Sequence, residues 1–107
     1  MKNSAARAST LMKALSSETR LLLLCQMNEG EISVNELAET LEMRPSSVSQ
    51  QLSLLRKDGL VKTRREGQTI FYSLDGEEAQ QVISVLYQLY CQSTYPWNHK
   101  TWKTSRP

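Results

Sequence analysis

The sequence predicts a small, mainly α-helical domain that carries one β-hairpin. Hydrophobic residues recur at helical spacing in four segments before residue 59 and in one segment after residue 76. Between these segments the hydrophobic period changes to two, which is typical of paired strands. The chain has 107 residues, of which 39% are hydrophobic, and this suffices for one compact core but not for two. Large enzymes and repeat arrays are thereby excluded.

The first two helices are predicted over residues 5–15 and 18–28. The first segment lacks glycine and proline, and its apolar residues share one helical face: Ala5, Ala8, Leu11, Met12 and Leu15. Ser16 or Ser17 can cap the second helix, and Gly30 stops it. Four leucines followed by Cys25 make the second helix apolar around most of its circumference, so we expect it to be largely buried.

The third and fourth helices are separated by a tight turn through Glu42 and Met43. Ser33 and Glu36 form a capping box at the start of the third helix, whose apolar face is Val34, Leu37, Ala38 and Leu41. The fourth helix fits between Pro45 in its first turn and Gly59 at its end. Its apolar face is Val48, Leu52 and Leu55, and its opposite, polar face contains Ser46, Gln50, Ser53 and Lys57.

A β-hairpin is predicted over residues 60–74, with its turn at Glu66-Gly67-Gln68. A last helix begins at Glu77 and reaches Cys91, with one apolar side formed by Ala79, Val82, Ile83, Leu86, Leu89 and Tyr90. We therefore expect one domain over residues 1–91 and an aromatic, basic tail over residues 92–107.

Two helices joined by a tight turn and followed by a basic hairpin predict a helix-turn-helix with a wing. Between Arg44 and Arg65 there are six basic residues and one acidic residue, which favours a polyanion as partner. Double-stranded DNA fits, because hydroxyl and amide side chains on a helix can reach base edges in the major groove. The predicted DNA-binding residues are Arg44, Ser46, Ser47, Ser49, Gln50 and Gln51 on the fourth helix and Arg64, Arg65 and Gln68 at the hairpin tip.

Residues 11–91 resemble the ArsR-type winged-helix repressors. The resemblance rests on Leu15-Ser16-Ser17-Glu18-Thr19-Arg20-Leu21, on Val48-Ser49-Gln50-Gln51-Leu52 with Gly59-Leu60-Val61, and on Arg64-Arg65-Glu66-Gly67-Gln68 with Tyr72-Ser73-Leu74. It implies a winged helix-turn-helix homodimer, formed through the first and last helices, that leaves its operator when a ligand binds. Arg44 stands where many members have a capping serine, and Gln51 stands where many have histidine.

Many members of that family sense metals, but the expected ligands are missing here. Ser33 and Asn35 stand where metalloid-sensing members show a cysteine pair. Residues 77–91 contain no histidine, and His99 is the only histidine of the chain. We therefore predict neither a metal nor a cofactor, although a metal-responsive repressor stays open as an alternative. Haem ligation by Cys91 or His99 is a further alternative.

Two cysteines, Cys25 and Cys91, are too few for a secreted disulfide framework. Core packing explains Cys25 about as well as function does, whereas Cys91 sits at the polar end of a helix. The pair resembles the dithiol of the persulfide-sensing branch of the ArsR-type family. That resemblance implies that reactive sulfur species or oxidants link the two cysteines and thereby weaken operator binding.

Three other interpretations compete with a thiol-responsive repressor. A small thiol enzyme would need a local signature, but the chain has no Cys-x-x-Cys, no phosphate loop and no nucleophile elbow. A protein-interaction winged helix, or an activator or anti-repressor of the same fold, stays open.

No apolar stretch approaches the roughly 18 residues of a membrane span, and no secretion signal is evident, so we expect a cytoplasmic protein. The tail, with Trp97 and Trp102, could contact DNA but is more simply a packing segment.

Overall fold

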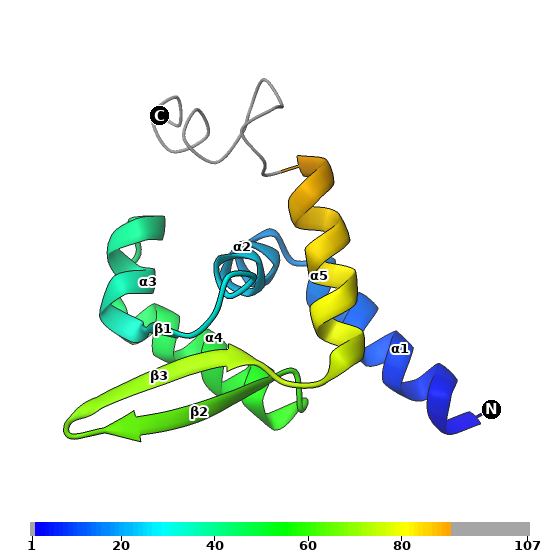
Figure 1. The fold of residues 1–107 in the computed structure, drawn as a ribbon, viewed down its shortest axis with the longest axis horizontal. Helices are drawn as coiled ribbons and strands as arrows, with labels where there is room; N and C mark the ends of the chain where they lie inside the picture. Colours follow the sequence, from blue (N-terminus) through cyan, green and yellow to red (C-terminus); the bar gives the residue numbers. More distant parts are fainter. Residues whose placement is uncertain (1, 91–107) are drawn as a thin grey trace.

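The computed structural model describes residues 2–90 and contains five helices and a small sheet within them (Figure 1). The elements follow one another as α1 (Lys2–Leu15), α2 (Glu18–Gln26), β1 (Ile32–Ser33), α3 (Val34–Leu41), α4 (Pro45–Lys57), β2 (Val61–Glu66), β3 (Thr69–Leu74) and α5 (Glu77–Tyr90). This is the predicted winged helix-turn-helix order with one added strand. No helix in the described part of the chain is long and apolar enough to cross a membrane.

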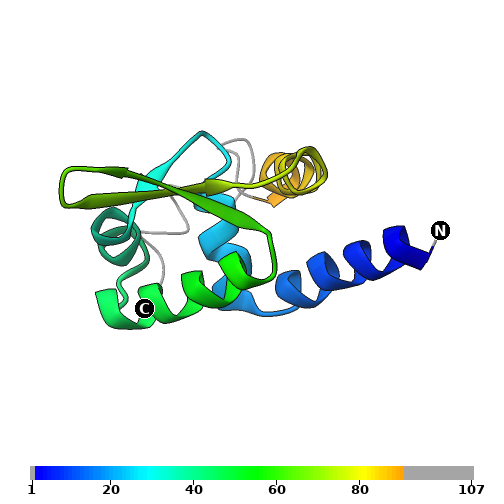
Figure 2. The same cartoon turned by 90° about the horizontal axis from the view of Figure 1, so that it is seen from below.

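The core lies between the helices and one face of the sheet, and all five helices contribute buried side chains to it. Its fully buried side chains include Leu23, Leu24, Leu37, Val48, Leu52, Leu55, Val61 and Ile83. The predicted burial of the second helix is confirmed, because Leu23, Leu24 and Cys25 are all buried. Figure 2 shows α4 alongside the hairpin, while α1 extends away from the rest of the molecule.

Local hydrogen bonds fix the helix ends close to the predicted positions. Ser17 caps α2 by accepting a hydrogen bond from the backbone N–H of Arg20, and α2 ends at Gln26, two residues earlier than predicted. Ser33 and Glu36 form the predicted capping box. The helix-turn-helix angle is set between α3 and α4, where Glu42 adopts a left-handed conformation with φ 57°.

The end of α4 is a Schellman motif built on Gly59. The N–H of Leu60 donates to the carbonyl of Leu55, and the N–H of Gly59 donates to the carbonyl of Arg56, both over 3.0 Å. Gly59 has φ 79°, a conformation that a residue without a Cβ adopts at little cost. The predicted glycine stop of the fourth helix is confirmed, and it sends the chain directly into the hairpin.

The sheet has three strands in the order β1-β3-β2, so the predicted hairpin is joined by a strand that the sequence did not reveal. Ile32 pairs with Tyr72 and Ser33 pairs with Phe71. Two residues are too few to show a period, and Ser33 also serves as the helix cap, so the local pattern indicates only a helix start. The short strand nevertheless brings the loop before α3 beside the hairpin.

Candidate nucleic-acid interface

The helix α4 is anchored by one apolar face and exposes the other. Val48, Leu52 and Leu55 have no exposed surface, so their side chains hold the helix against the core. Pro45 occupies the first helical turn, where a missing N–H costs nothing. Arg44 is the N-cap residue and makes no side-chain capping bond, consistent with the absence of the usual serine there.

The exposed face of α4 carries most of the predicted DNA-binding residues. Arg44, Ser46, Ser47, Ser49 and Gln50 are all exposed. Within residues 2–90, no side-chain hydrogen bond or ion pair engages any of these five. Their donors and acceptors are therefore available to a partner, and an α-helix fits a DNA major groove, which is about 12 Å wide.

Gln51 differs from its neighbours because it is half-buried and already engaged. Its Oε1 accepts a hydrogen bond of 3.1 Å from Nε of Arg20, which belongs to α2. Sequence reasoning missed Arg20 as a functional candidate. No sequence signal could have found it, because the two residues lie 31 positions apart and meet only through the packing of α2 against α4.

Sequence reasoning also missed Leu54, which lies on the same exposed face. The Leu54 side chain is 40% exposed, although Leu52 and Leu55 on either side of it are buried. It follows Gln50 by four residues, so the two side chains are neighbours on the helix surface. The helical period could have identified it, since it places Leu54 outside the apolar face formed by Val48, Leu52 and Leu55.

The wing, formed by β2 and β3, has a two-residue turn. Arg65 pairs with Ile70 and Glu66 pairs with Thr69, leaving Gly67 and Gln68 as the loop. Gly67 has φ 63° and Gln68 has no positive φ, which fits a type II′ hairpin turn. Arg65 and Gln68 are exposed, and neither makes a side-chain hydrogen bond or ion pair with another described residue.

Arg64 and Arg65 point to opposite faces of the hairpin, because successive residues of a strand alternate. Arg65 shares the face of Val61 and Tyr72, which is the side that packs toward α4. Arg64 is on the other face, opposite Phe71, with its guanidinium carbon 4.9 Å from the ring centroid. The structure therefore does not bring the two arginines together at the tip.

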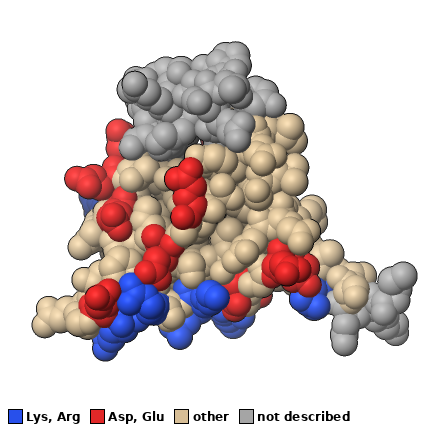
Figure 3. All heavy atoms as spheres, in the orientation of Figure 1, with Lys and Arg blue, Asp and Glu red and all other residues tan. Residues whose placement is uncertain are grey.

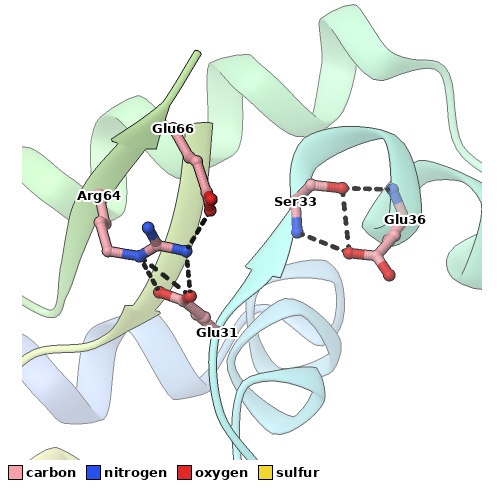
Figure 4. Close-up of polar contacts among 5 residues, drawn as sticks. All are labelled: Glu31, Ser33, Glu36, Arg64 and Glu66. Atoms are coloured by element: carbon pink, nitrogen blue, oxygen red, sulfur yellow. Dashed lines mark hydrogen bonds and ion pairs between the residues drawn. The ribbon is translucent and has the colours of Figure 1, made fainter. Parts of the chain in front are cut away.

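The side chain of Arg64 is held by two carboxylates (Figure 4). Its Nη2 donates to Oε1 of Glu31 over 2.6 Å and to Oε1 of Glu66 over 3.1 Å, and its Nε contacts both Glu31 oxygens at 3.0 Å. The Arg64 hydrogen bonds lower the pKa of Glu31, and the same contacts raise the pKa of Arg64. This cluster ties the wing to the loop before β1.

Charge is distributed unevenly over the surface. In Figure 3 most of the visible Lys and Arg side chains gather along the lower edge, over the hairpin and α4, and most of the Asp and Glu side chains lie above them. The predicted basic strip therefore exists as a surface. Arg64, however, contributes little free charge to it, because Glu31 and Glu66 neutralise its guanidinium.

Cys25 lies in the core, with 4% of its surface exposed, on the last turns of α2. The other predicted sensor residue, Cys91, and the predicted tail over residues 92–107 lie outside the described residues. The end of α5 is fixed beside the end of α2 by a hydrogen bond of 3.3 Å from Tyr87 Oη to Glu29 Oε2. Within residues 2–90, no group of three or more His, Cys, Asp or Glu side chains could hold a metal ion.

The helices α1 and α5 carry large apolar side chains that are exposed in the structure. Met12, Val85, Leu89 and Tyr90 have about half of their surface exposed. Beside them, a groove of about 660 Å³ runs between α1 and the start of α5, with Ala8, Leu11 and Val82 among its lining residues. Such an apolar face on a small domain indicates an interface with another chain.

Comparison with known proteins gives this surface a context. A family model described as "Bacterial regulatory protein, arsR family" matches residues 17–63, from the cap of α2 into β2. The transcriptional activator HlyU of Vibrio cholerae is 46% identical over 93 residues, which cover 87% of this chain and 86% of that protein. The biofilm growth-associated repressor of Agrobacterium fabrum is 42% identical over 91 residues, covering 85% and 78% of the two chains.

Solved structures agree with the fold. The structure of HlyU from V. cholerae matches with a TM-score of 0.80 at 47% identity, covering 86% of this chain and all of that one, and its reduced form gives the same TM-score. A homodimeric winged helix-turn-helix DNA-binding domain from Mycobacterium bovis matches with a TM-score of 0.72 at 27% identity, covering 82% of each chain.

Proposed function

We propose that this chain, which belongs to the arsR family of bacterial regulatory proteins, is a cytoplasmic DNA-binding repressor that reactive sulfur species release from its operator. The chain is a transcriptional regulator, as its relatives are. The observation that carries the proposal is the exposed polar face of α4, whose serines and Gln50 make no side-chain bond with other described residues. Such a face at the edge of a basic surface suits the major groove.

The wing supplies a second DNA contact in this proposal. Arg65 and Gln68 are exposed at the hairpin tip. Arg65 lies on the face of the sheet that packs toward α4. Such side chains reach phosphates or a narrow minor groove next to the site read by the helix. Arg64 takes a structural role instead, because it is already bound to Glu31 and Glu66.

A homodimer formed through α1 and α5 completes the DNA-binding unit. The exposed apolar side chains Met12, Val85 and Leu89 support this, since a partner chain would remove them from water. The homodimeric M. bovis domain supports it as well. In a two-fold dimer the two α4 helices meet half-sites about 34 to 36 Å apart, so their spacing decides whether both dock at once.

The proposed signal is a thiol reaction between Cys25 and Cys91, supported by the resemblance to persulfide-sensing regulators. A cysteine thiolate attacks the outer sulfur of a persulfide R–S–SH, forming Cys–S–SH and releasing the thiol R–SH. The second thiolate attacks the inner sulfur of Cys–S–SH, which forms the Cys–Cys disulfide and expels HS⁻. Two protein thiols are thereby oxidised, and the persulfide is reduced to R–SH and hydrogen sulfide. If both cysteines first become persulfides, the same attack leaves a trisulfide.

This reaction acts on DNA binding through helix packing. Cys25 belongs to α2, and Cys91 directly follows the last described residue of α5. A covalent bridge between them changes the angle of α5 against α2. Because α5 belongs to the proposed dimer interface, the two recognition helices change their separation, and simultaneous docking is lost.

The test is operator affinity measured before and after treatment with a polysulfide, at one fixed salt concentration. The DNA is the region upstream of the protein's own gene. We expect tight binding by the reduced protein and loss of binding after treatment, whereas the C25S and C91S variants bind in both conditions. A thermal unfolding curve of reduced C25S checks that the buried hydroxyl leaves the fold intact. If both variants release the DNA as the unmodified protein does, the thiol mechanism is wrong.

A second candidate function is an activator or anti-repressor of the same fold. The relative that is 46% identical is named a transcriptional activator, whereas the relative that is 42% identical is named a repressor. The two candidates share the DNA-binding surface and differ in the effect of bound protein on transcription. Transcription in vitro from the bound promoter, with and without the protein, distinguishes them, because a repressor lowers the transcript on its own.

A further inference from the structure

The contact between Arg20 and Gln51 has a chemical direction. An arginine side chain carries five N–H donors and no acceptor, so the amide of Gln51 must turn its oxygen toward Arg20. The 3.1 Å bond from Nε to Oε1 has this geometry. The Gln51 amide therefore holds its oxygen inward, and the NH₂ group is the end left for a partner.

The backbone of Arg20 is held in place as well. The backbone N–H of Arg20 donates to the hydroxyl of Ser17, which caps α2. Arg20 and Gln51 are both half-buried, so the bond between them is partly shielded from water. Gln51 itself is held between the buried Leu52 and the exposed Gln50 on α4, at the flank of the exposed face.

We propose that Arg20 is a specificity-determining positioning residue: it holds the Gln51 amide so that the NH₂ group, and not the oxygen, is presented to the major groove. This proposal rests on the proposed DNA-binding function. A free glutamine amide pairs with adenine through both its oxygen and its nitrogen. With the oxygen held by Arg20, Gln51 acts as a donor to guanine O6 or N7, thymine O4 or adenine N7. Cytosine offers only a donor on that edge, so Gln51 discriminates against it.

The experiment measures binding of the reduced, full-length protein to its operator and to all single-base variants of one half-site. Cytosine at the position that Gln51 contacts removes one hydrogen bond between neutral groups. We therefore expect it to weaken binding of the unmodified protein roughly three- to tenfold. Gln51→Ala removes this preference at that position. Arg20→Met keeps the packing of the stem, lets the amide rotate, and removes most of the same preference. In the Arg20→Met background, Gln51→Ala removes only the small remainder of that preference, because Arg20 acts through Gln51.

A matched control separates positioning from charge. Arg56 is an exposed cation on α4 without an ion pair to another described residue. Arg56→Met should weaken binding to all base variants by a similar factor and leave the base preference unchanged. Thermal unfolding of Arg20→Met verifies its fold. We expect the fold to persist, because the Ser17 hydroxyl accepts its capping bond from the backbone N–H of residue 20 and not from the arginine side chain.

The outcomes distinguish this proposal from the function on which it rests. If the unmodified protein binds selectively and Arg20→Met keeps its base preference at every position, Arg20 does not position Gln51 and the proposal is wrong. If Gln51→Ala alone leaves every preference unchanged, the proposal is likewise wrong. If the unmodified protein shows no sequence preference at all, the operator-binding function fails, and this proposal fails with it.

Discussion

The recognition helix α4 and the wing differ in how far their polar side chains are already engaged within the chain. On α4, the exposed serines and Gln50 make no side-chain bond within the described residues. On the wing, the Arg64 guanidinium is bound by Glu31 and Glu66, whereas the Arg65 and Gln68 side chains make no such bond with another described residue. A basic residue in a basic stretch of sequence is therefore not always a cation available to DNA.

The difference has a geometric origin. The face of α4 is set by a single element whose apolar residues repeat every three to four positions, so its polar face follows automatically. The outer face of the wing is set by its neighbours. The short strand β1 pairs with β3 and brings Glu31 within hydrogen-bonding distance of Arg64 on β2, although the two residues are 33 positions apart in the chain. The Arg64–Glu31 pair is thus a property of the three-stranded sheet, whereas the Arg64–Glu66 pair lies within β2 itself.

The largest expected effect tests the anchoring of α4. Leu52→Ala removes a fully buried side chain and should lower the free energy of unfolding by about 2–5 kcal/mol. Leu54→Ala, two residues away and 40% exposed, should change it by less than about 0.5 kcal/mol and instead weaken operator binding. Urea unfolding at one protein concentration measures the first quantity, and DNA titration measures the second. Equal destabilisation by both substitutions would contradict the distinction between the buried and the exposed face of α4.

An intermediate effect tests the two wing arginines against each other. Arg65→Ala should reduce the slope of log affinity against log salt by about 1, since one phosphate contact is lost. Arg64→Ala should leave that slope nearly unchanged, because Arg64 is bound to carboxylates. The salt slope is the proper readout, because both substitutions alter the long-range charge equally. Equal slopes for the two variants would contradict the distinction between the arginines.

The smallest effect concerns the pH dependence of the Glu31 contact. The pKa of Glu31 is lowered from 4.5 by its hydrogen bonds with Arg64, so the contact contributes fully above that pH and is lost as the pH falls through the lower native value. The stability difference between the unmodified protein and Glu31→Gln should therefore be constant at neutral pH and vanish in acid. Glu31→Gln should also raise DNA affinity slightly by releasing Arg64. Urea unfolding as a function of pH checks the first point, and a difference that grows toward acid would refute it.

The part of the candidate site that lies on the single helix α4 was largely predictable from the sequence. Val48, Leu52 and Leu55 identified the buried face of α4, and the exposed positions of Ser46 and Gln50 followed from the same period. Arg20 and Glu31 were not predictable, because each acts through a partner that is distant in sequence. The two-residue strand β1 was missed for a related reason: its existence depends on pairing with β3 and not on its own pattern.

The sequence by itself determined the helices, their caps, the hairpin turn and the winged helix-turn-helix order, because these depend on local spacing and on residues such as Ser33 and Gly59. Only the tertiary structure decided which polar groups are engaged and which are available. It pairs Arg64 with Glu31 and turns the oxygen of Gln51 toward Arg20. The physical reason is that hydrogen bonds and ion pairs act over a few ångströms of space, and folding alone brings distant residues within that range.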